Sequence, residues 1–413
     1  MLMMTWRHGC CVSGADCEGD LFSKDGMRLT FSESCAELAV GVERFRPFPE
    51  GSRIAVTLWV FPEETPGKAY SQLELSDGRR SLDNAFPANI WTLSAFEAKV
   101  LRDGERPYFL LKLCGTAALT VRLRLLSVQE SPLPERLFAG DRLTMLAQTN
   151  PKNGQMECLL YETEGHLIVV DGGEAEDAEH LYRKICECRP DRQVDLWLLT
   201  HYHCDHVNAL TRILERYDIR IRTLCYRFPT PEELEGNGDG DNYCVAAVND
   251  AVAAHPEKVE RVLTPGRGDA YRVGRVTVEV LNDACFTPND DFCNNSSVVY
   301  RFVTCGEKLL VLGDLASKGD DYLHDPEFRK AISECTVIQL AHHGQDGVSD
   351  RFYRSCKNIK VCLYCAPDWL YHVDNGGGYG SGIWLTLHTR RLMAELGVLR
   401  SYSCASGKDQ VLL

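Results

Sequence analysis

The residues of this 413-residue sequence that could perform chemistry are concentrated in the segment Leu198-Leu-Thr-His-Tyr-His-Cys-Asp-His-Val207. An apolar run ends just before the first histidine, and the pattern His-x-His-x-Asp-His follows at the predicted start of a helix. Alternate residues of an extended chain point the same way, so His201 and His203 can bind one metal ion. Asp205 and His206, where the chain turns into the helix, can face a second ion. A solvated polar loop is the ordinary alternative, but four potential ligands within six residues rarely occur by chance.

Three further apolar runs end in residues of the same kinds. Each end is weak evidence alone, because Asp-Gly-Gly, for example, is mostly a turn motif. The runs and their ends are Leu167–Val170 with Asp171-Gly172-Gly173, Leu309–Leu312 with Gly313-Asp314, and Val337–Leu340 with Ala341-His342-His343-Gly344. Loops at the ends of buried strands are rigid mounts for ligands, so together the four ends predict one metal site. Imidazole and carboxylate ligands suit zinc, manganese or iron.

The elements that position these residues alternate between strands and helices. Apolar residues recur on one face of two predicted helices, Ala178–Cys188 and His206–Tyr217. The continuous apolar runs, with Leu196–Leu199 among them, are typical of strands buried on both faces. This alternation of strands and helices begins after Ser131-Pro-Leu-Pro-Glu135, which we interpret as a linker because its two prolines interrupt helix and sheet.

The first third of the chain predicts an all-β sandwich domain over residues 1–130. Arg53–Phe61 and Leu119–Leu126 have the composition of strands, and the second run mostly alternates polar and apolar side chains. Short strands separated by turn signals favour a jelly-roll or galactose-binding-like sandwich. This pattern resembles carbohydrate-binding modules, which implies a glycan as a partner. Trp59 and Trp91 could stack on a sugar, although a place in the core is the commoner role of a tryptophan.

The composition restricts the partners and the compartment. A formal net charge of −14 disfavours duplex nucleic acid and an anionic membrane surface as partners. The sequence has no run of eighteen apolar residues and no signal-peptide pattern near its start, so we expect a cytoplasmic protein without a membrane span. In such a protein the 19 cysteines do not indicate a disulfide framework. Cys362 and Cys365 could form half of a zinc or redox site, but a place in a core strand is favoured.

From about Leu137 to the C-terminus, these motifs resemble the metallo-β-lactamase-fold superfamily. Its His-x-His-x-Asp-His and Asp-Gly-Gly motifs match residues 201–206 and 171–173, and its bridging aspartate matches Asp314. The resemblance implies an αββα sandwich over residues 137–413, with two divalent metal ions, zinc being preferred to manganese or iron.

Within the superfamily, the chain is most similar to the hydrolase domain of bacterial DNA-uptake competence proteins. That branch adds an Asn/Ser-rich strand start, here Asn294–Val299, and a His-His-Gly motif, here His342–Gly344. Two departures affect the metal site. Many members have a histidine just before the bridging-aspartate strand, where this chain has Asp291–Ser296, so the first metal would have one protein ligand fewer, or only one metal would bind tightly. Competence-type proteins also often carry aspartate at the position of His203, so the metal preference can differ.

The resemblance implies a role for each motif residue. Asp314 would bridge the metals and His342 would complete the second site, while His343 would be free to touch the substrate. Asp171 would orient a ligand or a loop. Cys204 lies inside the motif, but its side chain should point away from the two histidines, so we expect a structural role for it. The implied metal ligands are His201, His203, Asp205, His206, Asp314 and His342, and the implied catalytic residues are Asp205 and His343.

The implied reaction is hydrolysis by a hydroxide formed from bound water, whose pKa the metals lower from about 15.7 to roughly 7. A phosphodiester, either small or derived from nucleic acid, is the favoured substrate, and the acidic balance favours a small one. A lactone or thioester hydrolase and an inactive binding protein of the same fold are the alternatives. Flavin-linked oxygen reductases of the superfamily are disfavoured because no flavin domain follows. Asp368–Gly382, with five glycines, is a candidate wall of the substrate pocket or a plain surface loop.

Overall fold

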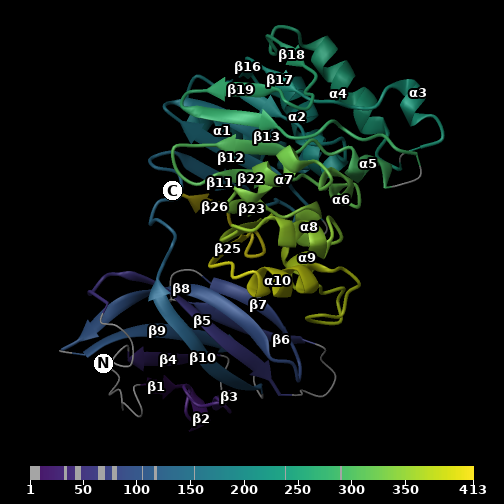
Figure 1. Ribbon diagram of the computed structural model, residues 1–413. Coiled ribbons are helices and arrows are strands. Elements are labelled where there is room, and N and C mark those ends of the chain that lie inside the picture. Colours follow the sequence, from purple (N-terminus) through teal and green to yellow (C-terminus); the bar gives the residue numbers. More distant parts are fainter. Residues whose placement is uncertain are drawn as a thin grey trace. The chain divides into compact units, whose positions relative to one another are not determined.

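The computed structural model describes residues 10–31, 35–41, 48–63, 70–76, 81–104, 106–115, 119–152, 154–237, 239–288 and 291–413. The chain divides into two compact units. Unit 1 contains residues 1–134 and His372–Ser401, and unit 2 contains Glu135–Tyr371 and Tyr402–Leu413. The segment 372–401, which the sequence analysis placed in the second domain, therefore groups with the first (Figure 1).

Unit 1 is built on antiparallel strands, as expected for its sequence. Their order is β1-β4-β9-β8-β5-β10-β3-β2, and β6 pairs with β7 and β9. The long strand β8 joins the two halves, because residues 92–99 pair with β5 and residues 100–103 pair with β9. The strands are β1 (Cys10–Ser13), β2 (Ala15–Gly19), β3 (Met27–Phe31), β4 (Cys35–Gly41), β5 (Arg53–Pro62), β6 (Tyr70–Ser76), β7 (Ser81–Pro87), β8 (Thr92–Asp103), β9 (Arg106–Gly115) and β10 (Thr120–Glu130).

Helix α10 (Thr386–Glu395) completes unit 1 from the C-terminal part of the chain. Its Leu387 packs with Ala85 of β7 and Val373 in a small apolar core. Nearby in the sequence, the buried guanidinium of Arg400 forms an ion pair with the buried carboxylate of Glu97 on β8. These contacts explain why residues 372–401 group with the β-strands of unit 1.

Unit 2 contains two seven-stranded sheets and a two-stranded one. The first sheet has the order β18-β17-β15-β13-β12-β11-β26, and the second has the order β19-β20-β21-β22-β23-β24-β25. In the first sheet β13, β15, β17 and β18 are parallel, and in the second β22, β23 and β24 are parallel.

The strands of the first sheet are β11 (Arg142–Met145), β12 (Cys158–Thr163), β13 (His166–Asp171), β15 (Leu196–Leu198), β17 (Leu224–Cys225), β18 (Val262–Leu263) and β26 (Gln410–Leu412). Those of the second are β19 (Ala270–Val273), β20 (Val276–Val280), β21 (Tyr300–Val303), β22 (Leu309–Val311), β23 (Val337–Gln339), β24 (Val361–Tyr364) and β25 (Arg400–Ser403), of which residues 400 and 401 are grouped with unit 1. The two-stranded sheet pairs β14 (Gln193–Val194) with β16 (Arg220–Ile221).

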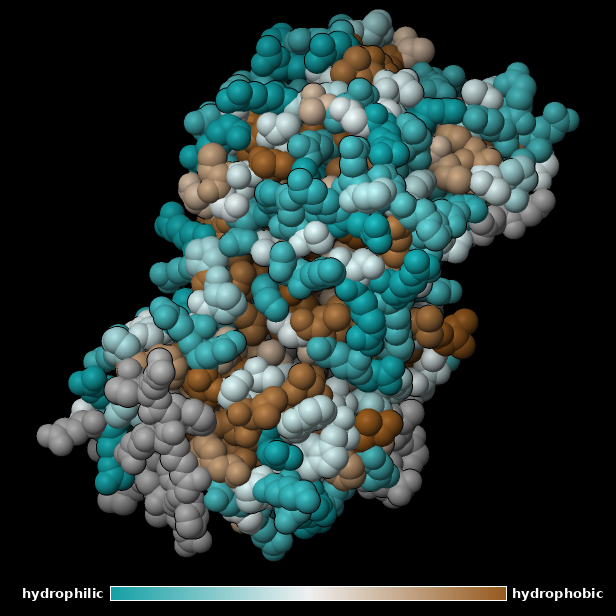
Figure 2. Space-filling model, in the orientation of Figure 1, coloured by the Kyte–Doolittle hydropathy of each residue, from teal (hydrophilic) through white to brown (hydrophobic). Residues whose placement is uncertain are grey.

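The helices of unit 2 lie outside the two main sheets (Figure 1). They are α1 (Ala178–Cys188), α2 (Cys204–Arg216), α3 (Pro231–Leu234), α4 (Tyr243–Ala254), α5 (Phe292–Asn295), α6 (Gly319–Tyr322), α7 (Pro326–Ser333), α8 (Asp350–Ser355) and α9 (Asp368–Tyr371). None of the helices in the described part of the chain is long and apolar enough to cross a membrane. On the face shown in Figure 2, hydrophilic side chains cover much of unit 2.

Side chains that point alternately to the two faces of each strand define the layers of unit 2. The rings of Tyr161 on β12 and Phe302 on β21 lie 5.6 Å apart, so the two sheets pack face to face. Arg301 points to the opposite face of β21, where its guanidinium donates to the carbonyl of Ala331 in α7. On the first sheet, the buried residues of α1, α2 and α4 share one core with the strands. The layers are therefore helix, sheet, sheet and helix, as expected.

The strands and helices of the α/β half agree closely with the sequence prediction. The helix predicted over Ala178–Cys188 is observed with those bounds, and the one predicted from His206 begins two residues earlier. Strands form at all four apolar runs that precede ligand-type residues. Because the carboxyl ends of parallel strands meet at one edge of a sheet, these residues come together.

Candidate metal centre

The predicted ligands of the four strand ends form one buried cluster in unit 2. Two overlapping groups have ligand atoms within 4.8 Å of one another: His201, His206 and Asp314, and Asp205, His206 and His343. Nε2 of His206 lies 3.3 Å from Oδ1 of Asp314, and Nε2 of His343 lies 2.9 Å from Oδ2 of Asp205. Residues more than 100 positions apart thus meet at one site, as the sequence analysis expected.

Each imidazole of the cluster has one ring nitrogen fixed by a partner outside it. His201 Nδ1 lies 3.1 Å from Thr200 Oγ1, His203 Nε2 lies 2.7 Å from Asp239 Oδ2, His206 Nδ1 lies 2.9 Å from Asp171 Oδ2, and His343 Nδ1 lies 2.7 Å from the carbonyl of Cys365. The other nitrogen of each ring faces the cluster. This arrangement is common in protein metal sites, because the outer partner fixes the ring and selects the tautomer that coordinates.

The inward nitrogens of His201 and His203 face each other. Nε2 of His201 and Nδ1 of His203 are 3.1 Å apart, which is close to the spacing of two nitrogens on one tetrahedral zinc ion, about 3.3 Å. The extended chain between the two histidines produces this approach, as the alternation argument predicted.

Asp171 lies behind His206, outside the cluster. Its carboxylate accepts hydrogen bonds from the backbone N–H of Thr200 at 2.8 Å and from the Thr200 hydroxyl at 2.7 Å, in addition to its contact with His206. Asp171 therefore holds both the end of β15 and one ligand. Its own φ of 53° lies in the left-handed region, a strained conformation that fits a functional position.

The turn that carries His342 and His343 is also left-handed. His342, His343 and Gly344 have φ values of 53°, 56° and 84°. A Cβ on Gly344 would lie 2.7 Å from the ring of Tyr364, so only glycine fits there. This turn buries His343 completely beside Asp205, whereas the side chain of His342 is 23% exposed and its Nε2 lies 3.8 Å from Oδ2 of Asp314.

The electrostatics of the cluster favour cation binding. Burial lowers the pKa of His206, but Asp314, Asp205 and Asp171 outweigh burial and hold the pKa well above its usual value. The pKa of His343 is likewise lowered by burial but raised overall by Asp314 and Asp205, to about 9. Burial raises the pKa of Asp314, but the nearby imidazoles outweigh it and hold the pKa well below its usual value. The carboxylates therefore keep their negative charge at neutral pH.

Unpartnered buried atoms show that the donor set fits metal ions. Among the described residues, His206 Nε2 and Asp314 Oδ1 are buried and have no hydrogen-bond partner. A buried polar atom without a partner is costly, and a divalent ion between these two atoms would satisfy both. Imidazoles and carboxylates at this spacing are ligands that zinc, manganese and iron accept.

Three residues near the cluster were not identified from the sequence as site residues. Glu157 is buried, forms a ligand-type group with Asp171 and His206, and accepts a hydrogen bond from Gln339 Nε2 at 2.7 Å. The sequence feature that could have identified Glu157 is its position directly before the apolar run of β12. The other two are Asp239, which contacts His203, and Cys293, which forms a ligand-type group with His201 and His203.

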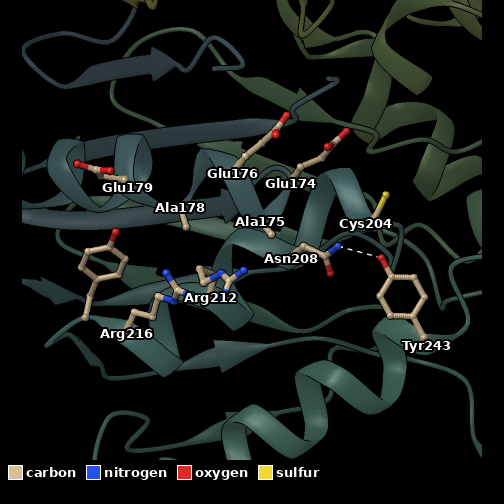
Figure 3. A pocket seen from close by; sticks show the side chains of 11 residues that line it. Glu174, Ala175, Glu176, Ala178, Glu179, Cys204, Asn208, Arg212, Arg216 and Tyr243 are labelled. Carbon is tan, nitrogen blue, oxygen red and sulfur yellow. Dashed lines mark hydrogen bonds between the residues drawn. The ribbon is translucent and has the colours of Figure 1, made fainter. Parts of the chain in front are cut away.

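The remaining sequence candidates lie elsewhere. Cys204 lines a separate groove of about 560 Å³ with Glu174, Arg212 and Tyr243 (Figure 3). None of the clustered histidines or aspartates lines this groove. Cys362 and Cys365 are buried on and just after β24.

The comparison with protein families agrees with this geometry. The family described as the metallo-beta-lactamase superfamily matches residues 153–237, which contain Asp171 and the His-x-His-x-Asp-His motif. This segment of the chain is therefore similar to the metallo-beta-lactamase superfamily, whose members are metal-dependent hydrolases. No curated protein matches the chain significantly.

Several solved structures are similar to the chain at low identity. The metallo-beta-lactamase fold protein YhfI from Bacillus subtilis is 12% identical over 66% of this chain and 99% of its own, with a TM-score of 0.40. Zn(2+)-bound PqqB from Methylobacterium extorquens is 10% identical over 66% and 99% of the two chains, with a TM-score of 0.39. A diphosphatase from the PhnP family is 12% identical over 58% and 93%, with a TM-score of 0.35.

Proposed function

We propose that unit 2 is a hydrolase with two divalent metal ions, zinc being preferred, and that its substrate is a phosphodiester. The observation that carries the metal centre is the convergence of four tethered imidazoles on Asp205 and Asp314. The unpartnered atoms His206 Nε2 and Asp314 Oδ1 support it further.

The ligands divide into two sets around Asp314. His201 and His203 would hold the first metal, and Asp205 and His206 would hold the second. Asp314 lies between the sets, since its Oδ2 is 3.8 Å from His201 Nε2 and its Oδ1 is 3.3 Å from His206 Nε2. Oδ2 is also 3.7 Å from Nε2 of His343, so Asp314 lies close to ligands of both sets and could help to hold both ions.

We assign the His-His-Gly residues the opposite roles to those that the sequence favoured. His343 is fully buried and both of its ring nitrogens face protein groups, so it cannot reach a substrate but can complete the second metal site. His342 is partly exposed, and its Nδ1 lies 3.0 Å from the carbonyl of Asp346. Its Nε2 is therefore free to face a substrate beside Asp314.

The chemistry follows from these positions. When bound, the metals lower the pKa of water and polarise the substrate's reacting group. Asp205 and Asp314 keep their charge and hold the cations, and Asp171 keeps the ring of His206 in its coordinating orientation. His342, at the exposed side of the cluster, can donate a proton or a hydrogen bond to the leaving oxygen.

The phosphodiester proposal rests on the similarity of the Asn294–Val299 and His342–Gly344 motifs to competence-type hydrolases. The net charge of −14 favours a small phosphodiester over a long nucleic acid. A lactone or thioester would be cleaved by the same metals and is the competing substrate class.

The test combines metal content with a substrate panel. The chain should contain about two equivalents of zinc or manganese and hydrolyse bis(p-nitrophenyl) phosphate, and the double variant His201→Ala/His203→Ala should lose metal and activity together. If the chain hydrolyses lactones and no phosphodiester, the proposed substrate class is wrong and a lactone is the substrate. A wild-type chain that takes up no metal would disprove the hydrolase.

For unit 1 we propose glycan binding by the surface around Trp91, within a jelly-roll or galactose-binding-like sandwich. Trp91 is 37% exposed, and its ring lies 5.2 Å from that of Phe61 on β5. Ile90 beside it is 53% exposed, so an apolar platform faces solvent. Binding to a glycan array that is lost in Trp91→Ala, with a retained melting temperature, would support this role, and no binding by the wild type would exclude it.

A further inference from the structure

The first metal has two histidine ligands, His201 and His203, and lacks the third histidine that related enzymes often supply from the segment before the bridging-aspartate strand. In this chain that segment contains Cys293 and no histidine. The Sγ of Cys293 lies within 4.8 Å of ring nitrogens of both His201 and His203. Among the described residues, this is the only ligand-type group that includes a cysteine.

We propose that the thiolate of Cys293 is the third protein ligand of the first metal, in a His2Cys set with Asp314. This inference rests on the proposed metal centre and specifies its composition. It also favours zinc over manganese, because a thiolate is a soft ligand that zinc accepts and manganese does not prefer.

The local fold delivers Cys293 to the histidines. Asp291 has a left-handed φ of 41° and starts the single turn of α5, and its Oδ1 accepts from the Asn294 side chain at 3.0 Å. The hydroxyl of Ser296 then closes the turn by donating to the carbonyl of Cys293 at 2.7 Å. This short turn places the cysteine side chain at a defined position.

Two hydrogen bonds fix the same segment to the strand ends that carry the other ligands. The N–H of Val298 donates to the carbonyl of Thr200, directly before His201, at 2.9 Å. The N–H of Asp314 donates to Ser297 Oγ at 3.1 Å. Cys293 is thus held in register with ligands on both sheets.

Competing candidates for the third ligand are less well placed. Asp239 contacts Nε2 of His203, the nitrogen that faces away from His201, so it orients that ring. The alternative is that Cys293 is an ordinary core residue that binds no metal, because it is 2% exposed and packs with the apolar core of α2 and α4. Cys244 is buried in the same core but belongs to no ligand-type group of the described residues, so it provides the matched control.

Cys293 Sγ needs to move only a short distance towards the ring nitrogens of His201 and His203 to share a metal ion with them. Zinc bonds of about 2.3 Å to sulfur and 2.0–2.1 Å to nitrogen place the donors about 3.5 Å apart in a tetrahedron. Side-chain rotation that brings Sγ closer by about 1 Å would therefore complete the site. Binding would release the thiol proton to solvent, since the thiolate is the ligand.

The test uses the full chain loaded with Co(II), with absorption spectra and metal content as readouts. The wild type should show a thiolate-to-cobalt charge-transfer band in the near ultraviolet. Cys293→Ser should lose the band and bind about one metal equivalent in place of two, whereas Cys244→Ala should keep both. The melting temperature of each variant reports whether it folds.

The outcomes separate this inference from the proposed function. Two bound metals without the charge-transfer band, or a band that persists in Cys293→Ser, would overturn the cysteine ligand and leave the hydrolase intact. A wild-type chain that binds no Co(II) would overturn both. If Cys293→Ser fails to fold, the wild-type spectrum alone decides, because thiolate coordination must appear there.

Discussion

The carboxylate of Asp171 accepts a hydrogen bond from Nδ1 of His206 at 2.9 Å, while Nε2 of the same ring has no hydrogen-bond partner among the described residues and lies 3.3 Å from Oδ1 of Asp314. The contact keeps a proton on Nδ1, so Nε2, which faces Asp314, is the nitrogen that would coordinate a metal. Because Asp171 also accepts from the backbone N–H of Thr200, it couples the ring to the end of β15. In the proposed metal centre, Asp171 would therefore influence how well His206 binds a metal by orienting its ring.

Replacing this carboxylate should weaken metal binding without unfolding the chain. In Asp171→Asn the acceptor for Thr200 can be kept, but the contact with His206 is weakened. We expect metal affinity to fall about 10–100-fold, as for other changes to the partner of a ligating histidine. Competition with a chelator measures the affinity. Asp177→Asn is the matched control, because Asp177 is equally buried but contacts Thr149 and Glu174. Equal losses in both variants would contradict the orienting role.

Substitution of His343 should change metal binding, whereas substitution of His342 should change turnover. His343→Ala should lose about one of two metal equivalents, because the buried ring contacts Asp205. His342→Ala should keep both metals and lose about 10²–10⁴-fold in kcat, the usual contribution of a general acid or base. Metal analysis and steady-state kinetics on each variant give both values. The reverse result, with metal lost only in His342→Ala, would restore the assignment that the sequence favoured.

Periodicity made the strands and helices of unit 2 predictable, and with them the meeting of ligands at the strand ends. Apolar runs such as Leu167–Val170 and the helical stripe of Ala178–Cys188 are local signals, and burial follows them directly. The choice between His342 and His343 was not predictable in this way. It depends on three consecutive left-handed residues, and only the last of them is a glycine.

Long-range contacts account for what the sequence did not indicate. Cys293 approaches the histidines because Val298 bonds to Thr200, nearly a hundred residues earlier, and no local pattern encodes that pairing. Similarly, Leu387 packs with Ala85, so residues 372–401 group with unit 1 although they follow the α/β segment. Asp368–Gly382 is divided between the units, and its role as a pocket wall stays a prediction.

Gly313, directly before Asp314, should be required both for its left-handed backbone and for the lack of a side chain beside Thr200. Gly313 has a φ of 55°, and a Cβ there would lie 2.6 Å from the Cβ of Thr200. Gly313→Ala should therefore cost about 3 kcal/mol, combining left-handed strain with overpacking at the metal site. Gly165, in the turn between β12 and β13, has a φ of 80° and no neighbour within 4 Å of such a Cβ, so Gly165→Ala should cost only about 1 kcal/mol. Denaturant unfolding compares the two, and equal costs would refute the steric argument.

Acid should weaken the attachment of the C-terminal segment of unit 2 through Asp409. Burial raises the pKa of its carboxyl, but His180, the N–H of Ala147 and Lys184 outweigh burial and lower the pKa to about 2. Because the folded pKa is below the unfolded value of 3.8, this stabilisation is complete above about pH 5 and is lost as the pH falls towards 2. Since the group is only half buried, we expect about 1 kcal/mol at neutral pH.

Asp409→Asn should accordingly unfold more easily than the wild type at pH 7, and the difference should shrink between about pH 5 and pH 2. Urea unfolding at several pH values measures it. Asp218→Asn is the control, because the Asp218 side chain is 76% exposed in its ion pair with Arg192 and should contribute little at any pH. A difference for Asp409→Asn that does not change with pH would show that shape, and not charge, holds the segment in place.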